Sequence, residues 1–172
     1  MTKAQGFTAI ELMIALAILL IIVTLATPSF TEYFDRRRLE AATEMIYTQL
    51  KFAHAESLRK RLTVYASFNP GTAWCFGLSD SHSCNCTLNN DCQLDSVQNV
   101  INSTSQKIDS IAISGMSMAG GIGTLQIDGI RGTLPNAGTV TLSRNNKTVL
   151  LTLNVAGLIN RCSTSISSYP TC

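Results

Sequence analysis

The chain contains 172 residues, of which 45% are hydrophobic and 14% are charged, and its formal net charge is +2 at pH 7. A chain of this length has room for one folded domain beside a separate apolar segment, so we expect one domain and one anchor. From Leu62 onward five basic residues balance five acidic ones, so this part lacks the strongly basic surface that is typical of nucleic-acid-binding domains.

The first element is an apolar run over residues 7–27, in which Glu11 is the only ionisable side chain. The run has 21 residues, enough for a helix that crosses a bilayer core of roughly 30 Å. A carboxylate inside such a helix costs about 2.5–3.5 kcal/mol on insertion scales, so Glu11 requires a compensating partner. The alternative is an ordinary membrane anchor that tolerates one acid.

The residues before the run indicate processing at its start. A secretory signal would have a shorter apolar core followed by its cleavage site, whereas here KAQG at residues 3–6 precedes FTAIE at residues 7–11. This arrangement resembles the class III leader of type IV pilins and pseudopilins, apart from Ala9, where the family more often has leucine. The resemblance implies that prepilin peptidase cuts between Gly6 and Phe7 and methylates the new amine of Phe7.

Such processing would give Glu11 a partner of opposite charge. The new amine of Phe7 would lie one helical turn from the Glu11 carboxylate, and methylation would preserve its positive charge. Each charge would then lower the cost of burying the other. The resemblance implies that Glu11 pairs with the amino terminus of a neighbouring subunit and sets the axial register during filament assembly.

A second helical segment follows Pro28, whose ring clashes with the carbonyl group of Thr24 and predicts a kink. Further apolar residues then recur at helical spacing and predict one face of an amphipathic helix that ends at about Arg61. These residues are Leu39, Ala42, Ile46, Leu50, Ala53 and Leu58. The basic residues at 59–61 lie in the last turn, where cations favour the negative end of the helix dipole.

Beyond residue 61 the periodicity changes from helical to alternating. Six short β-branched or aromatic runs predict strands at residues 63–67, 73–78, 108–114, 124–127, 139–143 and 148–155. We expect these strands to form a mostly antiparallel sheet in which residues 149–155 are the most deeply buried. Residues 79–105 are rich in Ser, Asn, Asp and Cys and predict a long polar loop, and the glycines of residues 115–123 predict a flexible connection.

Six cysteines lie well beyond the apolar run: Cys75, Cys84, Cys86, Cys92, Cys162 and Cys172. An even number confined to this part of the chain predicts disulfide bonds formed in an oxidising periplasm, with fifteen possible connectivities. We expect a bond between Cys162 and Cys172 and two bonds within residues 75–92. Zinc binding is the alternative, but the cluster lacks the paired spacing of zinc ligands.

Catalytic and cofactor-binding patterns are missing from the sequence. His54 lies in the helical segment and His82 in the polar loop, neither beside a recognisable nucleophile. The sequence contains no G-x-x-x-x-G-K, H-E-x-x-H or G-x-S-x-G pattern. We therefore expect a protein that is not an enzyme and that uses no cofactor or metal ion.

The distal part of the chain is similar to the branch of the pilin-like family that contains H-type pseudopilins and FimT/FimU-type minor pilins. The similar segments are residues 54–61, 64–65, 74–77 with the Cys84-x-Cys86 loop, 138–142 and 157–162. The resemblance implies a minor pilin that assembles into a type IV pilus near its tip. The alternative is a subunit of the type II secretion pseudopilus.

DNA binding is a second alternative. Some FimT-like pilins capture DNA through a Gly-Arg-x-Arg motif, whose guanidinium groups contact phosphates. The matching positions in this chain are residues 157–160, which read Gly-Leu-Ile-Asn and lack both arginines. The remaining candidates for DNA contact are Arg144, Lys147 and Arg161.

Together these observations predict an α+β fold in which a long amino-terminal helix packs on a disulfide-linked antiparallel sheet. The expected divisions are a leader over residues 1–6, a membrane and filament-core helix over 7–28, an amphipathic helix over 29–61 and a periplasmic head over 62–172. The expected location is the bacterial inner membrane, crossed once, and afterwards the pilus or pseudopilus. The expected partners are prepilin peptidase, membrane lipid, the inner-membrane assembly platform and other pilins that contact the helix.

Overall fold

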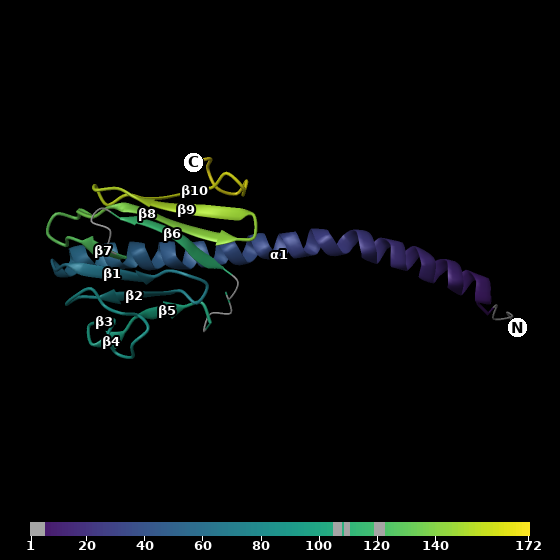
Figure 1. The fold of residues 1–172 in the computed structure, drawn as a ribbon, viewed down its shortest axis with the longest axis horizontal. Helices are drawn as coiled ribbons and strands as arrows, with labels where there is room; N and C mark the ends of the chain where they lie inside the picture. The colour runs from purple at the N-terminus through teal and green to yellow at the C-terminus, as the bar shows by residue number, and fades with distance from the viewer. Residues whose placement is uncertain (1–5, 105–107, 109–110, 119–122) are drawn as a thin grey trace, which may run out of the picture. The chain divides into compact units, whose positions relative to one another are not determined.

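The computed structural model describes residues 6–104, 108, 111–118 and 123–172, and it describes residues 25–29 by their backbone alone. One long helix, α1 (Ala9–Lys60), begins the described chain, and ten strands follow it within the described residues (Figure 1). The chain divides into two compact units, residues 1–35 and 36–172, and α1 runs through both. The bounds of α1 agree with the helix that the sequence predicts from residue 7 to about residue 61.

The first unit contains the amino-terminal half of α1. The helix continues through Pro28, and the kink expected there stays a prediction because the side chains of residues 25–29 lie outside the described part of the chain. Among the described residues, no helix is both long enough and apolar enough to span a membrane. The span expected over residues 7–28 includes side chains that are not described, and residues 1–5 of the expected leader lie outside the described residues.

The head, residues 36–172, contains two four-stranded sheets in place of the single sheet that the sequence predicts. One sheet has the order β5-β2-β1-β7, the other has the order β10-β9-β8-β6, and β3 and β4 form a separate ladder. Every strand pair is antiparallel, as predicted. The strands are β1 (Val64–Asn69), β2 (Cys75–Ser79), β3 (Gln93–Leu94), β4 (Val97–Gln98), β5 (Val100–Asn102), β6 (Ala112–Met118), β7 (Thr124–Ile127), β8 (Gly138–Arg144), β9 (Lys147–Leu153) and β10 (Ile159–Cys162).

The prediction of one long loop over residues 79–105 is wrong, because this region contains β3, β4 and β5. β5 extends the first sheet by pairing with β2, with Gly77 opposite Val100. Strands of two or three residues are too short to produce a visible alternation in the sequence. Two disulfide bonds, Cys75–Cys86 and Cys84–Cys92, hold the connection after β2. A side chain at Gly77 would collide with Cys92, so this close packing requires glycine.

Two further strand predictions need correction. The strand expected over residues 108–114 begins and ends four residues further along the sequence. It is β6, which covers Ala112–Met118 and includes Gly115. The flexible connection predicted over residues 115–123 is therefore wrong up to residue 118, and residues 119–122 lie outside the described residues. The pairing of β6 with β8 shifts register between Ile113 and Gly115, and this irregularity interrupts the alternation on which the prediction depends. Sequence analysis also misses β10, which forms by pairing with β9.

The carboxyl-terminal half of α1 contributes one face to the core of the head. Five positions predicted to share this face are fully buried with apolar side chains of both sheets: Leu39, Ala42, Ile46, Leu50 and Ala53. The prediction for Leu58 is wrong, because Leu58 is exposed and Ser57, four residues after Ala53, continues the buried face. The Ser57 hydroxyl donates a hydrogen bond of 2.8 Å to the carbonyl oxygen of His54, which satisfies this polar group.

β2 is the most completely buried strand, since all five of its residues are buried. It lies between β1 and β5, so its backbone hydrogen-bonds on both sides. The sequence predicts that residues 149–155 form the most deeply buried strand. In the structure, β9 alternates between buried and less buried side chains, and Val155 is exposed. Apolar content alone does not show which strand has both of its faces covered.

Candidate functional site

The peptide bond between Gly6 and Phe7 lies at the exposed start of the described chain. Phe7 is 86% exposed, and apart from the two chain neighbours of Gly6 no described residue has an atom within 4 Å of the position that a Cβ on Gly6 would occupy. α1 begins at Ala9, so this bond lies outside the helix. An uncovered peptide bond in non-helical backbone is accessible to a protease.

Thr8 and Glu11 form a capping box at the first turn of α1. The backbone N–H and the hydroxyl of Thr8 donate to Oε2 of Glu11, at 2.9 and 2.8 Å, and the backbone N–H of Glu11 lies 3.3 Å from Oγ1 of Thr8. These bonds satisfy donors that the first turn of a helix leaves without intrahelical partners. The apolar run draws attention to Glu11 alone, and Thr8 was not predicted to cap the helix, although Thr-x-x-Glu before an apolar run is the sequence signature of this cap.

The capping box fixes the Glu11 carboxylate at the start of the apolar helix. Both donors from Thr8 use the same carboxylate oxygen, Oε2. An ionised carboxylate offers about four acceptor positions, so Glu11 can accept a further cationic donor without losing its bonds to Thr8. The geometry therefore shows Glu11 as a helix cap that keeps acceptor positions beyond those used by Thr8.

The helix that follows is apolar on all sides and uncovered in the single chain. Eleven large apolar side chains between Ile10 and Val23 are each 50–68% exposed. Soluble proteins rarely leave a continuous apolar surface of this extent in water. This uncovered apolar surface is therefore a candidate contact surface of the chain.

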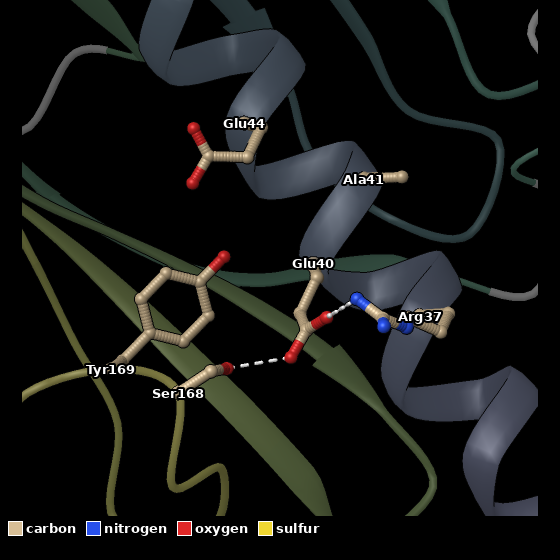
Figure 2. Close-up of a pocket in the computed structure, with 6 residues that line it drawn as sticks. All are labelled: Arg37, Glu40, Ala41, Glu44, Ser168 and Tyr169. Atoms are coloured by element: carbon tan, nitrogen blue, oxygen red, sulfur yellow. Dashed lines mark hydrogen bonds and ion pairs between the residues drawn. The ribbon is translucent and has the colours of Figure 1, made fainter.

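A second cluster lies inside the head, where the carboxyl-terminal loop meets α1. A disulfide bond between Cys162 and Cys172 closes this loop, which is the pair that sequence analysis expects. The Ser168 hydroxyl donates a hydrogen bond of 2.6 Å to Glu40 on α1, as Figure 2 shows. Between loop and helix lies an open pocket of about 460 Å³, lined by Arg37, Glu40, Ala41, Glu44, Ser168 and Tyr169.

Arg161 completes the contact between this loop region and the helix. Its guanidinium group pairs with Glu44 and lies 4.0 Å from the ring centre of Tyr47, a cation–π distance. Burial, together with the nearby carboxylates of Glu44 and Glu40, raises the pKa of Tyr169. These contacts hold the loop on α1.

The residues proposed for DNA contact do not converge. Arg144 and Lys147 lie opposite each other where β8 turns into β9. Arg161 lies in β10 opposite Leu151, four residues further along β9 than Lys147, which is about 13 Å at 3.3 Å per residue. Arg161 is also occupied by the helix contacts described above. The structure therefore does not assemble a shared phosphate site from these three residues.

The two histidines lie apart and take part in local contacts. Nε2 of His54 lies 3.0 Å from the carbonyl oxygen of Gly132, and Nδ1 of His82 lies 2.9 Å from the Ser81 hydroxyl. Nε2 of His82 lies 3.3 Å from Asp91. Within the described residues, no group of three His, Cys, Asp or Glu side chains is arranged to hold a metal ion.

Comparisons with known proteins address both halves of the chain. Residues 1–27 match the prokaryotic N-terminal methylation motif, and residues 42–157 match the family of the type II transport protein GspH. No curated protein matches the chain. The fold is similar to that of a solved structure, the type IV minor pilin FimU from Pseudomonas aeruginosa strain PAO1. The identity is 16%, the TM-score is 0.50, and the match covers 74% of this chain and 90% of that one.

The family match extends over more than half of the chain and includes strands of both sheets. The methylation motif covers Gly6, Phe7 and Glu11, the residues that sequence analysis connects with processing and assembly. Members of pilin-like families are structural subunits of filaments and not enzymes. The chain therefore belongs to the GspH family and is a pilin-like subunit, a pseudopilin or minor pilin with an N-terminal methylation motif.

Proposed function

We propose that this protein is a minor pilin that prepilin peptidase cuts between Gly6 and Phe7 and methylates at Phe7. The mature chain then leaves the bacterial inner membrane and joins a type IV pilus near its tip. Before assembly, lipid surrounds the amino-terminal half of α1 and the head lies in the periplasm. During assembly, the inner-membrane platform transfers this half of α1 into a bundle of helices from other pilins.

The observation that carries this proposal is the combination of Glu11 with an uncovered apolar helix. The side chains from Ile10 to Val23 need a low-dielectric environment, and in that environment a lone carboxylate is costly. A methylated ammonium group on Phe7 of a neighbouring subunit supplies the opposite charge. The Thr8 cap holds the carboxylate in place and leaves it acceptor positions for this pair.

Substitution of Glu11 tests the assembly role. Glu11→Ala removes the carboxylate, and Glu11→Gln keeps its size and hydrogen-bonding oxygen but removes its charge. We expect both variants to be cut and methylated, and to be depleted from sheared filaments at least about tenfold relative to wild type, because the pair needs the charge. Equal incorporation of Glu11→Gln and wild type would contradict a role for the charge.

The amino terminus of protein recovered from its native host tests the processing step. Mass spectrometry is expected to find a chain that begins with methylated Phe7. Gly6→Val places a branched side chain at the cleavage position and is expected to leave the chain starting at Met1, with the protein retained in the membrane. A wild-type chain that still begins at Met1 would contradict the proposal.

The family match favours a second candidate, a subunit of the type II secretion pseudopilus, because the matched family is that of the type II transport protein GspH. Cysteines placed at exposed positions of α1, such as Phe34 and Phe52, can be crosslinked in cells to neighbouring helices. Capture of the major pilin would support the pilus assignment. Capture of secretion pseudopilins would support the pseudopilus assignment, and capture of neither would contradict both.

A further inference from the structure

Large exposed apolar side chains gather at the end of the head where α1 finishes. Leu58 is 43% exposed, Ile130 80%, Val155 59% and Leu158 56%. We call these four residues the end surface. They come from three separate segments: the last turn of α1, the connection between β7 and β8, and the connection between β9 and β10. Figure 1 shows these segments at the same end of the head.

Short contacts join the three segments into one surface. Nε2 of His54 on α1 lies 3.0 Å from the carbonyl oxygen of Gly132 in the β7–β8 connection. The backbone N–H of Leu134 donates a bond of 3.0 Å to the carbonyl oxygen of Val155. A Cβ on Gly132 would lie 3.2 Å from Cδ2 of Leu58, which places this leucine directly beside the connection.

Backbone hydrogen bonds fix the two connections that carry Ile130 and Leu158. In the first connection, Asp128 accepts bonds from the backbone N–H of Ile130 at 2.8 Å and donates its own N–H to Thr133 at 2.9 Å. In the second, Oδ1 of Asn154 accepts the N–H of Leu158 at 2.9 Å. Apolar side chains on turns that are already ordered lose little conformational freedom on binding, which favours association.

The rim of the end surface is basic. Arg61 follows Leu58 by three residues, is exposed, and forms no ion pair with another described residue. Arg131 is next to Ile130, and its side chain is 78% exposed. The carboxylate of Asp128, which pairs with Arg131 at 3.3 Å, also accepts the backbone N–H groups of Ile130 and Arg131. An apolar centre with a charged rim is the usual composition of a protein interface.

From this arrangement we infer that the end surface binds another protein subunit, whose contact face has an apolar centre and an acidic rim. The inference rests on the proposed function, since it concerns a subunit of a pilin-like assembly. Acidic side chains of the partner would pair with Arg61 and Arg131, and its apolar side chains would cover Ile130 and Leu158. Complementary charges select the partner and its orientation, while apolar burial supplies affinity.

The charges argue against a second copy of this chain as the occupant. The region where α1 enters the head carries four arginines against three acidic residues: Arg36, Arg37, Arg38 and Arg161 against Asp35, Glu40 and Glu44. Both glutamates already pair with these arginines. Stacking two copies end to end would therefore bring basic rims together, and pairing two end surfaces would do the same. DNA would match the rim but leave the apolar centre uncovered, so a protein partner fits better.

Site-specific photo-crosslinking of the full-length protein in its native cells tests the inference. The photoreactive residue replaces Ile130 or Leu158 in the end surface, and Leu88, which is 55% exposed in the disulfide-linked connection after β2, is the control position. We expect Ile130 and Leu158 to yield an adduct with one pilin-like subunit other than this chain, and Leu88 to yield none with it. An adduct with a second copy, with nucleic acid or with lipid alone would overturn the inference, as would the absence of any adduct.

Charge reversal tests the rim. Arg61→Glu combined with Arg131→Glu is expected to lower the yield of the adduct about tenfold, because like charges then face each other. Replacing acidic residues of the captured subunit by lysine is expected to restore it. Arg61→Gln with Arg131→Gln serves as a milder variant, and thermal unfolding of each variant checks that the head is folded. A yield that is unchanged by charge reversal in a folded head would overturn the proposed acidic rim.

Glu11→Ala separates this inference from the proposed function. If filament incorporation does not depend on Glu11 while the adduct from Ile130 forms normally, the assembly role of Glu11 fails and the docking surface stands. If incorporation depends on Glu11 but no subunit is captured from Ile130 or Leu158, the docking surface fails and the assembly role stands.

Discussion

The two halves of α1 differ in apolar content, and their large apolar side chains have opposite fates in the single chain. Between Ile10 and Val23 the large apolar side chains are at least half exposed, whereas Leu39, Ile46 and Leu50 are fully buried. The first half is apolar on every side, whereas the second half buries one apolar face and leaves Phe52 and Leu58 exposed. A helix that is apolar all round leaves these side chains uncovered in the single chain.

This difference separates two tasks that one continuous helix performs. The second half of α1 stabilises the head, because its apolar face packs against both sheets. Among the described residues, the core of the head includes no side chain from the first half. We therefore expect substitutions in the two halves to have separable effects, on stability in one half and on filament incorporation in the other.

The largest expected effect is a difference between Leu50→Ala and Leu16→Ala in the free energy of unfolding of the head. Leu50→Ala leaves a cavity in the core of the head and should lower its free energy of unfolding by about 2–5 kcal/mol. Leu16→Ala, in the uncovered half, should leave it unchanged. Thermal unfolding of each full-length variant in detergent, monitored by near-ultraviolet circular dichroism, measures the change in stability. Equal losses in the two variants would show that the halves are not independent.

Removal of the disulfide bonds should have the next largest effect, and only on the head. Replacing Cys75 and Cys86 together by alanine is expected to cost about 2–4 kcal/mol, because the bond restricts the unfolded chain and ties β2 to the connection after it. The pair Cys162 and Cys172 provides the comparison. Its removal should release the carboxyl-terminal loop from Glu40 while the core stays folded. Amide hydrogen exchange would locate each loss of protection.

A smaller effect is expected at the start of α1. Thr8→Ala removes the capping hydroxyl and should cost the first turn about 1 kcal/mol. Faster hydrogen exchange at residues 9–12 would report this loss, and the unfolding temperature of the head should not change. Thr48→Ala, at an exposed position in the second half of the helix, is the matched control. Equal exchange in Thr8→Ala and wild type would contradict the capping role.

The smallest expected effect is a pH dependence at the end of α1. The hydrogen bond from Arg59, with a further contribution from Lys60, lowers the pKa of Glu56 to about 2. The unfolded chain has a glutamate pKa of about 4.3, so this stabilisation is present above that pH and is lost as the pH falls towards 2. The unfolding temperature of wild type should therefore exceed that of Glu56→Gln at pH 6, and the two should converge near pH 2. A constant difference over this range would contradict the assignment.

Local sequence patterns were sufficient for the elements that depend on near neighbours. The spacing of Leu39, Ala42, Ile46, Leu50 and Ala53 predicts the buried face of α1, because helical geometry alone determines which residues share a face. Alternation predicts β7 at its observed bounds and β1, β8 and β9 to within two residues at each end. The Thr-x-x-Glu cap was equally readable, since all of its hydrogen bonds join residues three apart.

What the sequence determined by itself is therefore the long helix, its division into an apolar and an amphipathic half, and the leader motif that surrounds Glu11. Only the tertiary structure decided that the strands form two sheets, that β2 is the most buried strand and that Ser57, not Leu58, continues the core. It also decided that Arg161 pairs with Glu44, 117 positions away in the sequence, and that Leu58 joins Ile130 and Leu158 in the end surface. The physical reason is that these features depend on contacts between distant segments, and local periodicity carries no information about which segments meet.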